Sequence, residues 1–189
     1  MLVKIFGSAI YGVSAQTITI EVNVDTGGVG YHLVGLPDNA IKESSYRISA
    51  ALKNVGYKIP GKKITINMAP ADLRKEGSSY DLSIAIGILA ASDQIIADNL
   101  SDYVIMGELS LDGGLQPIKG VLPIAIKARE EGFKGIILPK QNTREAAIVN
   151  NLEVYGVENI SEVIQFFNEG IPLERTEIDT RKEFTDKIN

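Results

Sequence analysis

The feature that most constrains this chain is a helix-length run that has almost no polar face. Residues Tyr80 to Ser92 are apolar nearly all round, and the most apolar stretch runs from Leu82 to Ala91. A helix that crosses a membrane needs about 20 such residues, so this run is too short to span a bilayer. A helix that is apolar on every side must be covered on every side. The sequence therefore predicts a central helix buried by the rest of the fold.

Alternating segments predict the sheet that covers this helix. From Thr17 to Val24 polar and apolar residues alternate strictly, and residues 64–68 repeat the pattern. A period of two is typical of a strand with one buried face. The turn at residues 26–28 predicts a hairpin or meander between the second and third strands. Further strands are expected at residues 3–6, 31–34, 104–106, 108–111, 135–138 and 153–157.

Helical signals separate the later strands. Asp38 or Asn39 is expected to cap a helix that stops at Gly56, and Pro123 with Gly132 brackets another. Asn142 with Glu145 resembles a capping box, and a last helix is expected from Ser161 to Gly170. Mixed strands followed by βα units predict an α/β or α+β fold, and we expect an α+β fold with two α/β layers. Residues 1–172 are expected to form this domain, and residues 173–189 a polar linker.

Composition removes several classes of active site. The chain has no Cys and one His, which excludes thiolate zinc sites, a Cys nucleophile and a His-rich metal centre. A Ser-His-Asp triad would have to use His32, which lies inside a predicted strand. Residues 56–63 nearly spell a phosphate-binding loop, but they follow a helix and precede a strand, the reverse of the required order.

Ser78 and Ser79 carry two open interpretations. They lie on a loop that opens the buried helix, where a helix N-terminus stabilises developing negative charge, so either could act as a nucleophile. Alternatively, Ser78 with Asp81 forms the S-x-x-D pattern of a capping box. We expect the capping interpretation.

Basic charge is concentrated in one segment. Residues 42–75 contain eight lysines and arginines against two acidic residues, in a chain whose net charge is −5. Such asymmetry can mark an anionic partner, so these side chains are the candidate nucleic-acid contacts. They are Lys42, Arg47, Lys53, Lys58, Lys62, Lys63, Arg74 and Lys75.

Several consecutive motifs resemble one known family. They are V-G-L-P-D at 34–38, I-T-I-N-M-A-P-A-D-L at 64–73, K-E-G at 75–77 with Y-D-L at 80–82, and G-E-L-S-L-D-G at 107–113. In this order they resemble the N-terminal domain of the magnesium-chelatase-like AAA+ ATPases, the YifB- or ComM-like proteins. The resemblance covers residues 1–172.

The resemblance implies a fold and a setting. It implies the ribosomal-protein-S5 domain 2-like fold, which the Lon protease domain shares. It also implies that an AAA+ module follows a linker resembling residues 173–189, binds ATP and Mg²⁺, and assembles a homo-hexamer. No cofactor or metal is expected in the present chain. Its expected partners are that module and, where the basic segment is used, DNA. No membrane contact is expected, and the expected compartment is the cytoplasm.

The same resemblance allows a test for Lon-type chemistry, which uses a Ser nucleophile and a Lys base. Ser79 occupies the position that matches the Lon nucleophile, but Leu122 stands where the Lon lysine should be. A leucine cannot accept the serine proton. We therefore expect a non-catalytic domain of a DNA-processing ATPase, of the competence-related, branch-migrating kind. Two alternatives are a divergent serine hydrolase that uses Ser79, and a magnesium chelatase subunit.

Overall fold

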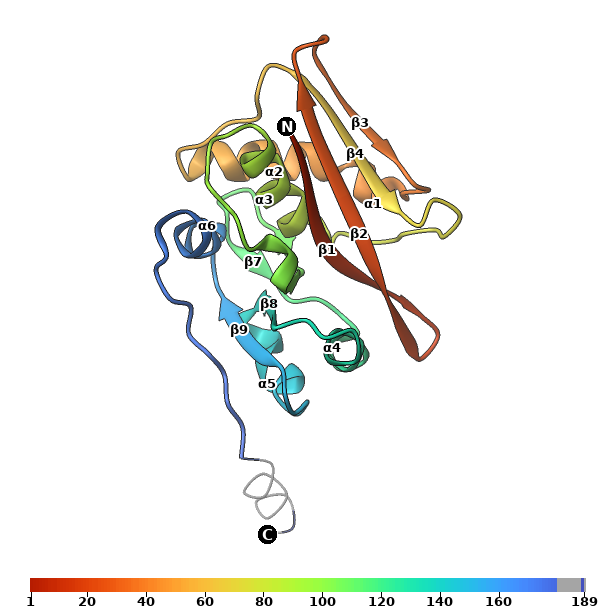
Figure 1. Ribbon diagram of the computed structural model, residues 1–189, viewed down its shortest axis with the longest axis vertical. Coiled ribbons are helices and arrows are strands. Elements are labelled where there is room, and N and C mark those ends of the chain that lie inside the picture. The colour runs from red at the N-terminus through yellow and green to blue at the C-terminus, as the bar shows by residue number, and fades with distance from the viewer. Residues whose placement is uncertain (180–187, 189) are drawn as a thin grey trace.

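The computed structural model describes residues 1–179 and 188, and these form one mixed sheet with helices packed against it (Figure 1). The seven-stranded sheet has the order β3-β4-β2-β1-β5-β8-β9. β1 pairs antiparallel with β2, and β2 with β4, whereas the other neighbours run parallel. The strands are β1 (Leu2–Tyr11), β2 (Ser14–Asp25), β3 (Gly30–Val34), β4 (Lys63–Ala69), β5 (Tyr103–Ile105), β8 (Gly135–Pro139) and β9 (Glu153–Val157). A two-stranded ribbon is formed by β6 (Glu108–Leu109) and β7 (Leu115–Gln116).

The expected central helix is present and fully enclosed. Helix α3 (Asp81–Ala91) has all of its residues buried, and it packs against β1, β2, α2 and α6. It packs against the inward faces of β1 and β2, which contribute Ile5, Ile20 and Val22 to the core. The other helices are α1 (Asn39–Lys42), α2 (Ser44–Asn54), α4 (Val121–Glu130), α5 (Thr143–Ala146) and α6 (Ile160–Glu169). The predicted combination of strands and helices in a mixed α/β fold is confirmed.

The expected hairpin between the second and third strands is wrong. β3 does not lie beside β2, because β4 is inserted between them and pairs with both. The chain leaves β3, forms α1 and α2, and returns as β4 parallel to β3, which requires a crossover rather than a tight turn. The single helix expected from Asp38 to Gly56 is likewise divided at Glu43.

Three expected helix caps are used differently. Asp81 is engaged by an arginine, and α3 begins with no side-chain cap, so the Ser78–Asp81 capping box is wrong. The amide of Asn142 instead bonds both main-chain groups of Ile118, at 2.9 Å each. The last helix is capped by Asn159, which forms a capping box with Glu162, two residues before the expected Ser161. The expected Asp38 cap is present, since its carboxylate accepts the Ile41 amide at 2.9 Å.

The beginning of the predicted linker lies against the domain. Arg175 is opposite Tyr155 of β9 in an isolated antiparallel bridge, and the Thr176 amide donates to the Val154 carbonyl at 2.8 Å. Leu173 packs against the core. Residues 180–187 and 189 of that linker lie outside the described residues. Among the described residues, no helix is long and apolar enough to cross a membrane.

Close packing of α3 on the sheet predicts the effect of one substitution. A Cβ added at Gly87 would lie 2.7 Å from Cγ2 of Val22, a buried β-branched side chain that has little freedom to move. Overpacking costs about 1–3 kcal/mol, whereas exchanging Gly for Ala inside a helix gains about 1 kcal/mol. We expect Gly87→Ala to lower the free energy of unfolding by about 1 kcal/mol in urea titrations.

Two further variants isolate the packing effect. Gly61→Ala adds a Cβ that meets no atom within 4 Å, so it should leave stability nearly unchanged. Shortening the opposing side chain in Gly87→Ala/Val22→Ala should make the Gly87 change less costly than it is alone. A Gly87→Ala protein more stable than the parent would contradict the packing argument.

Candidate functional site

A cavity of about 670 Å³ lies where the hairpin strand β1 meets the loop that leads into α3. One wall is the second half of β1, and the opposite wall is the loop from Arg74 to Tyr80. The remaining sides come from the chain after β5 and from the approach to α4. The lining residues are Ser8, Ala9, Ile10, Tyr11, Arg74, Glu76, Gly77, Ser78, Ser79, Tyr80, Met106, Glu108, Pro117, Ile118, Lys119 and Ile124.

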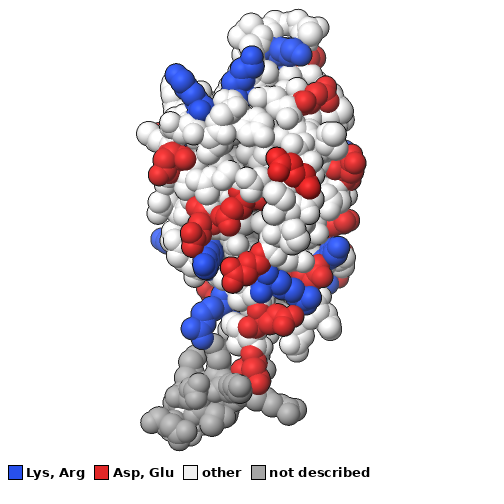
Figure 2. All heavy atoms as spheres, turned by 90° about the vertical axis from the view of Figure 1, so that its left-hand side faces the viewer, with Lys and Arg blue, Asp and Glu red and all other residues white. Residues whose placement is uncertain are grey.

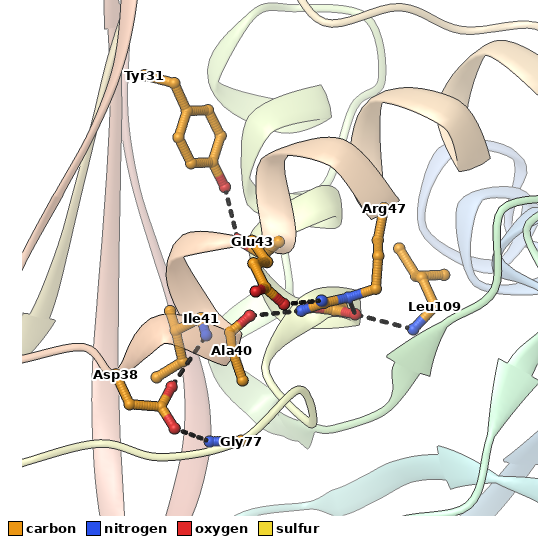
Figure 3. A network of polar contacts seen from close by, with 10 residues as sticks. Tyr31, Asp38, Ala40, Ile41, Glu43, Arg47, Gly77 and Leu109 are labelled. Atoms are coloured by element: carbon orange, nitrogen blue, oxygen red, sulfur yellow. Dashed lines mark hydrogen bonds and ion pairs between the residues drawn. The ribbon is translucent and has the colours of Figure 1, made fainter.

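The loop that forms this wall is held in place by Asp38. One oxygen of the Asp38 carboxylate accepts the Ile41 amide, and the other accepts the Gly77 amide at 3.0 Å (Figure 3). The Asp38 amide also donates to the Lys75 carbonyl at 3.0 Å. One side chain therefore caps α1 and fixes the loop that carries Ser78 and Ser79. The V-G-L-P-D and K-E-G motifs, far apart in sequence, form this contact.

Lys75 fixes the same loop from inside the protein. Its side chain is fully buried, and Nζ donates to the Gly35 carbonyl at 2.8 Å and to the Pro70 carbonyl. Burial lowers the pKa of Lys75, opposed by the nearby Asp72 carboxylate. The expectation that Lys75 contacts nucleic acid is therefore wrong, because its amine points into the protein and is used to join two loops. Gly35 itself lies against the main chain of β4, since its φ is 103° and a Cβ there would lie 2.1 Å from the Met68 carbonyl oxygen, so the position requires glycine.

Arg47 also lies inward, against the first residue of α3. Its Nε donates to Asp81 at 2.6 Å and its Nη2 donates to the other carboxylate oxygen at 2.9 Å (Figure 3). The Asp81 carboxylate also accepts the Leu109 amide at 3.1 Å. Burial raises the pKa of Asp81, while the Arg47 and Leu109 donors oppose that shift. The Arg47 guanidinium donates to this carboxylate and to the Ala40 carbonyl, and its side chain is 18% exposed. The nucleic-acid contact expected for Arg47 stays a prediction, and these internal contacts do not favour it.

The remaining basic candidates are exposed. Figure 2 shows basic side chains at the upper end of one face, the end at which the α2–β4 loop lies in Figure 1, with acidic side chains spread over the middle of that face. Arg74 is paired with Glu76 at 3.1 Å, with both side chains about 70% exposed, so this pair contributes little to stability. The exposed candidates are Lys42, Lys53, Lys58, Lys62, Lys63 and Arg74.

Ser79 and Leu122 lie in different surroundings. Ser79 lines the cavity, and its carbonyl accepts the Gly107 amide at 2.8 Å. Among the described residues, no lysine nitrogen is hydrogen-bonded to its hydroxyl. Leu122 lies near the start of α4 and packs against the apolar core instead of lining the cavity. Lys119 does line the cavity, from the loop before α4. The match to the Lon motifs did not predict this position.

Sequence reasoning also missed the contribution of β1 to the cavity. Ser8 and Tyr11 carry no local motif, and they reach the site only because the hairpin passes beside the loop of residues 74–80. The Tyr11 hydroxyl donates to the Arg74 carbonyl at 2.6 Å, which bridges the two walls. In the part of the chain that the structure describes, no group of three His, Cys, Asp or Glu side chains is placed to share a metal ion.

Comparison with known proteins defines the class. Residues 20–142 match the family described as the ChlI subunit of Mg-chelatase. The chain belongs to this family, as its motifs predicted, and the family is AAA+ ATPase-like. It is 45% identical to "Competence protein ComM" of Haemophilus influenzae over 91% of its length, and 43% identical to "Uncharacterized protein YifB" of Escherichia coli over 88%.

The Lon relationship is more distant. The chain is 29% identical to "Lon protease 2" of Bacillus subtilis over 84% of its length, which is consistent with the Lon-like fold that was expected. The present chain spans about a third of the length of these curated relatives, namely 34% of the ComM protein, 33% of the YifB protein and 31% of the Lon protease.

The Arg47–Asp81 pair predicts a large effect on stability. Removing one partner of a buried ion pair leaves an uncompensated charge and costs about 3–5 kcal/mol. The Arg47 side chain keeps 18% exposure, so we expect Asp81→Asn to lower the free energy of unfolding by about 3 kcal/mol, the lower end of that range, in urea titrations.

Glu43 provides the matched control. It lies 3.9 Å from the same guanidinium but is 68% exposed, so Glu43→Gln should change stability by less than about 1 kcal/mol. Equal losses in the two variants would show that the buried pair is not what fixes the start of α3.

Proposed function

We propose that this chain is a non-catalytic domain of a magnesium-chelatase-like AAA+ ATPase, and that the parent protein is a hexameric, ATP-dependent DNA-processing enzyme. The AAA+ module of the parent would bind ATP and Mg²⁺, and the present domain would be its attached partner, in the cytoplasm. A branch-migrating helicase with a role in competence fits the similarity to the protein named ComM. The magnesium chelatase alternative is not favoured by any group of three His, Cys, Asp or Glu side chains placed to share a metal ion in the described residues.

The environment of Leu122 carries the non-catalytic part of this proposal. A serine hydroxyl becomes a nucleophile when a neighbouring base removes its proton. Leu122 occupies the position that matches the Lon lysine, and its partly buried side chain packs against the core. The loop with Ser79 is nevertheless held firmly by Asp38 and Lys75, so the cavity persists without the dyad.

One observation favours a second candidate, a divergent serine hydrolase. Lys119 lines the same cavity as Ser79, and it lies three residues before Leu122, the position that matches the Lon lysine. In this alternative Lys119 would take the serine proton.

A fluorophosphonate probe separates the two candidates. We expect the probe to label the unmutated 189-residue chain no more than it labels the Ser79→Ala variant. A serine without a neighbouring base loses the ~10²–10⁴-fold contribution of proton transfer. Labelling would be read by mass spectrometry of the modified peptide, with Ser78→Ala as the matched variant. Labelling lost in both Ser79→Ala and Lys119→Met would instead establish the hydrolase.

The proposed DNA contact uses the exposed end of the basic segment. Lys58 and Lys62 lie on the α2–β4 loop, and Lys63 begins β4 beside them. Their side chains are exposed, so they can approach phosphates without the desolvation cost that a buried amine would carry.

Salt dependence tests this contact. We expect weak binding of duplex DNA by the chain, and Lys58→Glu/Lys62→Glu should reduce the slope of log affinity against log salt by about 2, since each phosphate contact contributes about 0.9. Lys4→Glu/Lys134→Glu changes the net charge equally at two other exposed positions and should leave most of the slope in place. Binding that is insensitive to salt, measured by fluorescence anisotropy, would contradict a phosphate contact.

A further inference from the structure

Strand β3 forms one edge of the seven-stranded sheet, and no described strand pairs with its outer side. Figure 1 shows β3 as the outermost strand at the right-hand end of the sheet. None of its five residues is buried, since His32 and Val34 are exposed and the others are half-buried. The opposite edge, β9, differs because Arg175 and Thr176 lie along it. An uncovered edge presents main-chain donors and acceptors that another strand can bind.

The pairing register shows which main-chain groups of β3 lie on the open side. The Gly30 amide donates at 3.4 Å to the carbonyl of the residue before β4, so Gly30 directs its main chain toward β4. Successive residues of a strand direct these groups to opposite sides. His32 and Val34 therefore also face β4, whereas Tyr31 and Leu33 face outward. Within the described residues, neither Tyr31 nor Leu33 forms a main-chain hydrogen bond outside the β3–β4 ladder.

The segment around β3 lacks the charges that usually protect an edge strand. Residues 26–37 contain no Lys, Arg, Asp or Glu, and Pro37 follows the strand instead of interrupting it. Natural edge strands commonly carry a lysine, another charge or a proline that prevents pairing. Three exposed apolar side chains lie on or beside β3 instead: Val29 is 81% exposed, Leu36 55% and Val34 48%. An uncharged edge with exposed apolar side chains favours pairing with another strand.

The strand is complementary to a second copy of itself. When two β3 strands overlap fully and run antiparallel, Tyr31 lies opposite Leu33 of the second copy, and Leu33 lies opposite Tyr31. Both outward-facing residues then form hydrogen-bonded pairs, in which each pair exchanges both of its N–H···O=C bonds. The exposed Val34 lies opposite Gly30 of the second copy, which has no side chain. A two-fold axis relates the strands, as in most dimers of identical chains.

This axis places the two His32 side chains opposite one another. Tyr31 and Leu33 pack against the core, so His32 lies on the other face of the sheet. A residue at the axis forms a non-hydrogen-bonded pair with its copy, with Cα atoms about 4.5 Å apart. The His32 ring lies over Gly30, since a Cβ at Gly30 would be 2.7 Å from Nε2 of His32. Val34 of the second copy would therefore contact this ring.

We propose that β3 is a dimerisation edge: two copies of this chain pair β3 with β3, antiparallel about an axis at His32, and join their seven-stranded sheets into one. The proposal concerns the surface of the domain, so it stands independently of the function proposed above. If the parent forms the proposed ring, this two-fold contact joins one ring to a second ring, because neighbours within a ring make heterologous contacts.

Sedimentation velocity of the full 189-residue chain tests for the dimer. The measured mass should rise with concentration from 20.4 kDa toward twice that value. In hydrogen-exchange NMR, the amides of Tyr31 and Leu33 should exchange more slowly as the dimer forms. A chain that stays monomeric up to about 1 mM, the weak end of specific association, would overturn the proposal. Protection of these amides only after a different protein is added would also overturn it, because the edge would then bind another partner.

Exchange of charge at His32 tests the register. His32→Glu or His32→Lys alone places two like charges about 5 Å apart at the axis, so either variant should dimerise at least about fivefold more weakly. A mixture places Glu opposite Lys, so the mixed dimer should form in preference to either dimer of one variant. Native mass spectrometry would measure this with one variant labelled with heavy nitrogen. Dimers that persist in both single variants, without preference for the mixed pair, would contradict the register.

Thr65 provides the matched control. It lies beside His32 on β4, on the same face of the sheet, and is half-buried. In the proposed dimer the two Thr65 positions are separated by three strand spacings, or about 14 Å, beyond the Debye length of about 8 Å at physiological salt. Thr65→Glu and Thr65→Lys should therefore leave the Kd of the dimer nearly unchanged, and their mixture should show no preference for the mixed pair.

Leu33→Pro tests the main-chain bonds. It removes an outward-facing donor from each copy and leaves the β3–β4 bonds in place, because the Leu33 amide faces away from β4. Loss of two hydrogen bonds in the dimer should weaken dimerisation about 30-fold. Circular dichroism and thermal melting would show whether the variant folds, and the His32 variants decide the proposal if it does not. Unchanged dimerisation of folded Leu33→Pro would overturn the proposal.

Discussion

The Arg47–Asp81 ion pair is the interaction on which the arrangement of this domain most depends. Helix α3 is enclosed on every side, yet its first residue carries a carboxylate that is 1% exposed. An unpaired charge at that depth is strongly unfavourable, so the helix can occupy the centre of the fold only where a guanidinium and an amide meet the carboxylate. Arg47 comes from α2 and the Leu109 amide comes from β6. The pair therefore fixes three elements relative to one another, at the end of α3 that faces the cavity.

The cavity beside that end is built from contacts between loops. Asp38 accepts the Gly77 amide, 39 residues away in sequence, and Lys75 donates to the Gly35 carbonyl, 40 residues away. Together they hold the loop that carries Ser79. In a Lon-type site such a loop would present the nucleophile to a lysine. Here the matching position on α4 is Leu122, which is partly buried and packs against the core. The cavity thus contains a serine whose hydroxyl has no lysine partner among the described residues, while the exposed Lys58, Lys62 and Lys63 lie on a separate loop and at the start of β4.

Much of the fold could be predicted from local patterns. The period-two alternation of residues 17–24 gave the position of β2, and the apolar run after Tyr80 gave α3, because both patterns record which faces are buried. The pairing of β3 was not predictable in this way. The turn at residues 26–28 is compatible with a hairpin, and only the long ladder between β2 and β4 decides that β4 lies between β2 and β3. Ser78 and Asp81 match a capping pattern, but the Asp81 carboxylate binds Arg47 of α2 instead.

The sequence by itself determined the family, the buried central helix and the absence of a lysine at the Lon position, because these depend on residue identity and order. Only the tertiary structure decided what each polar side chain does. In the sequence, Lys75 and Arg47 resemble surface cations of a basic segment. In the structure, Lys75 donates to main-chain carbonyls and Arg47 pairs with Asp81, because segments far apart in the chain surround them. Lys119 and the second half of β1 line the same cavity as Ser79 for the same reason. Whether a polar side chain is buried, and which group it binds, depends on contacts between segments far apart in the chain. Local sequence carries little information about those contacts.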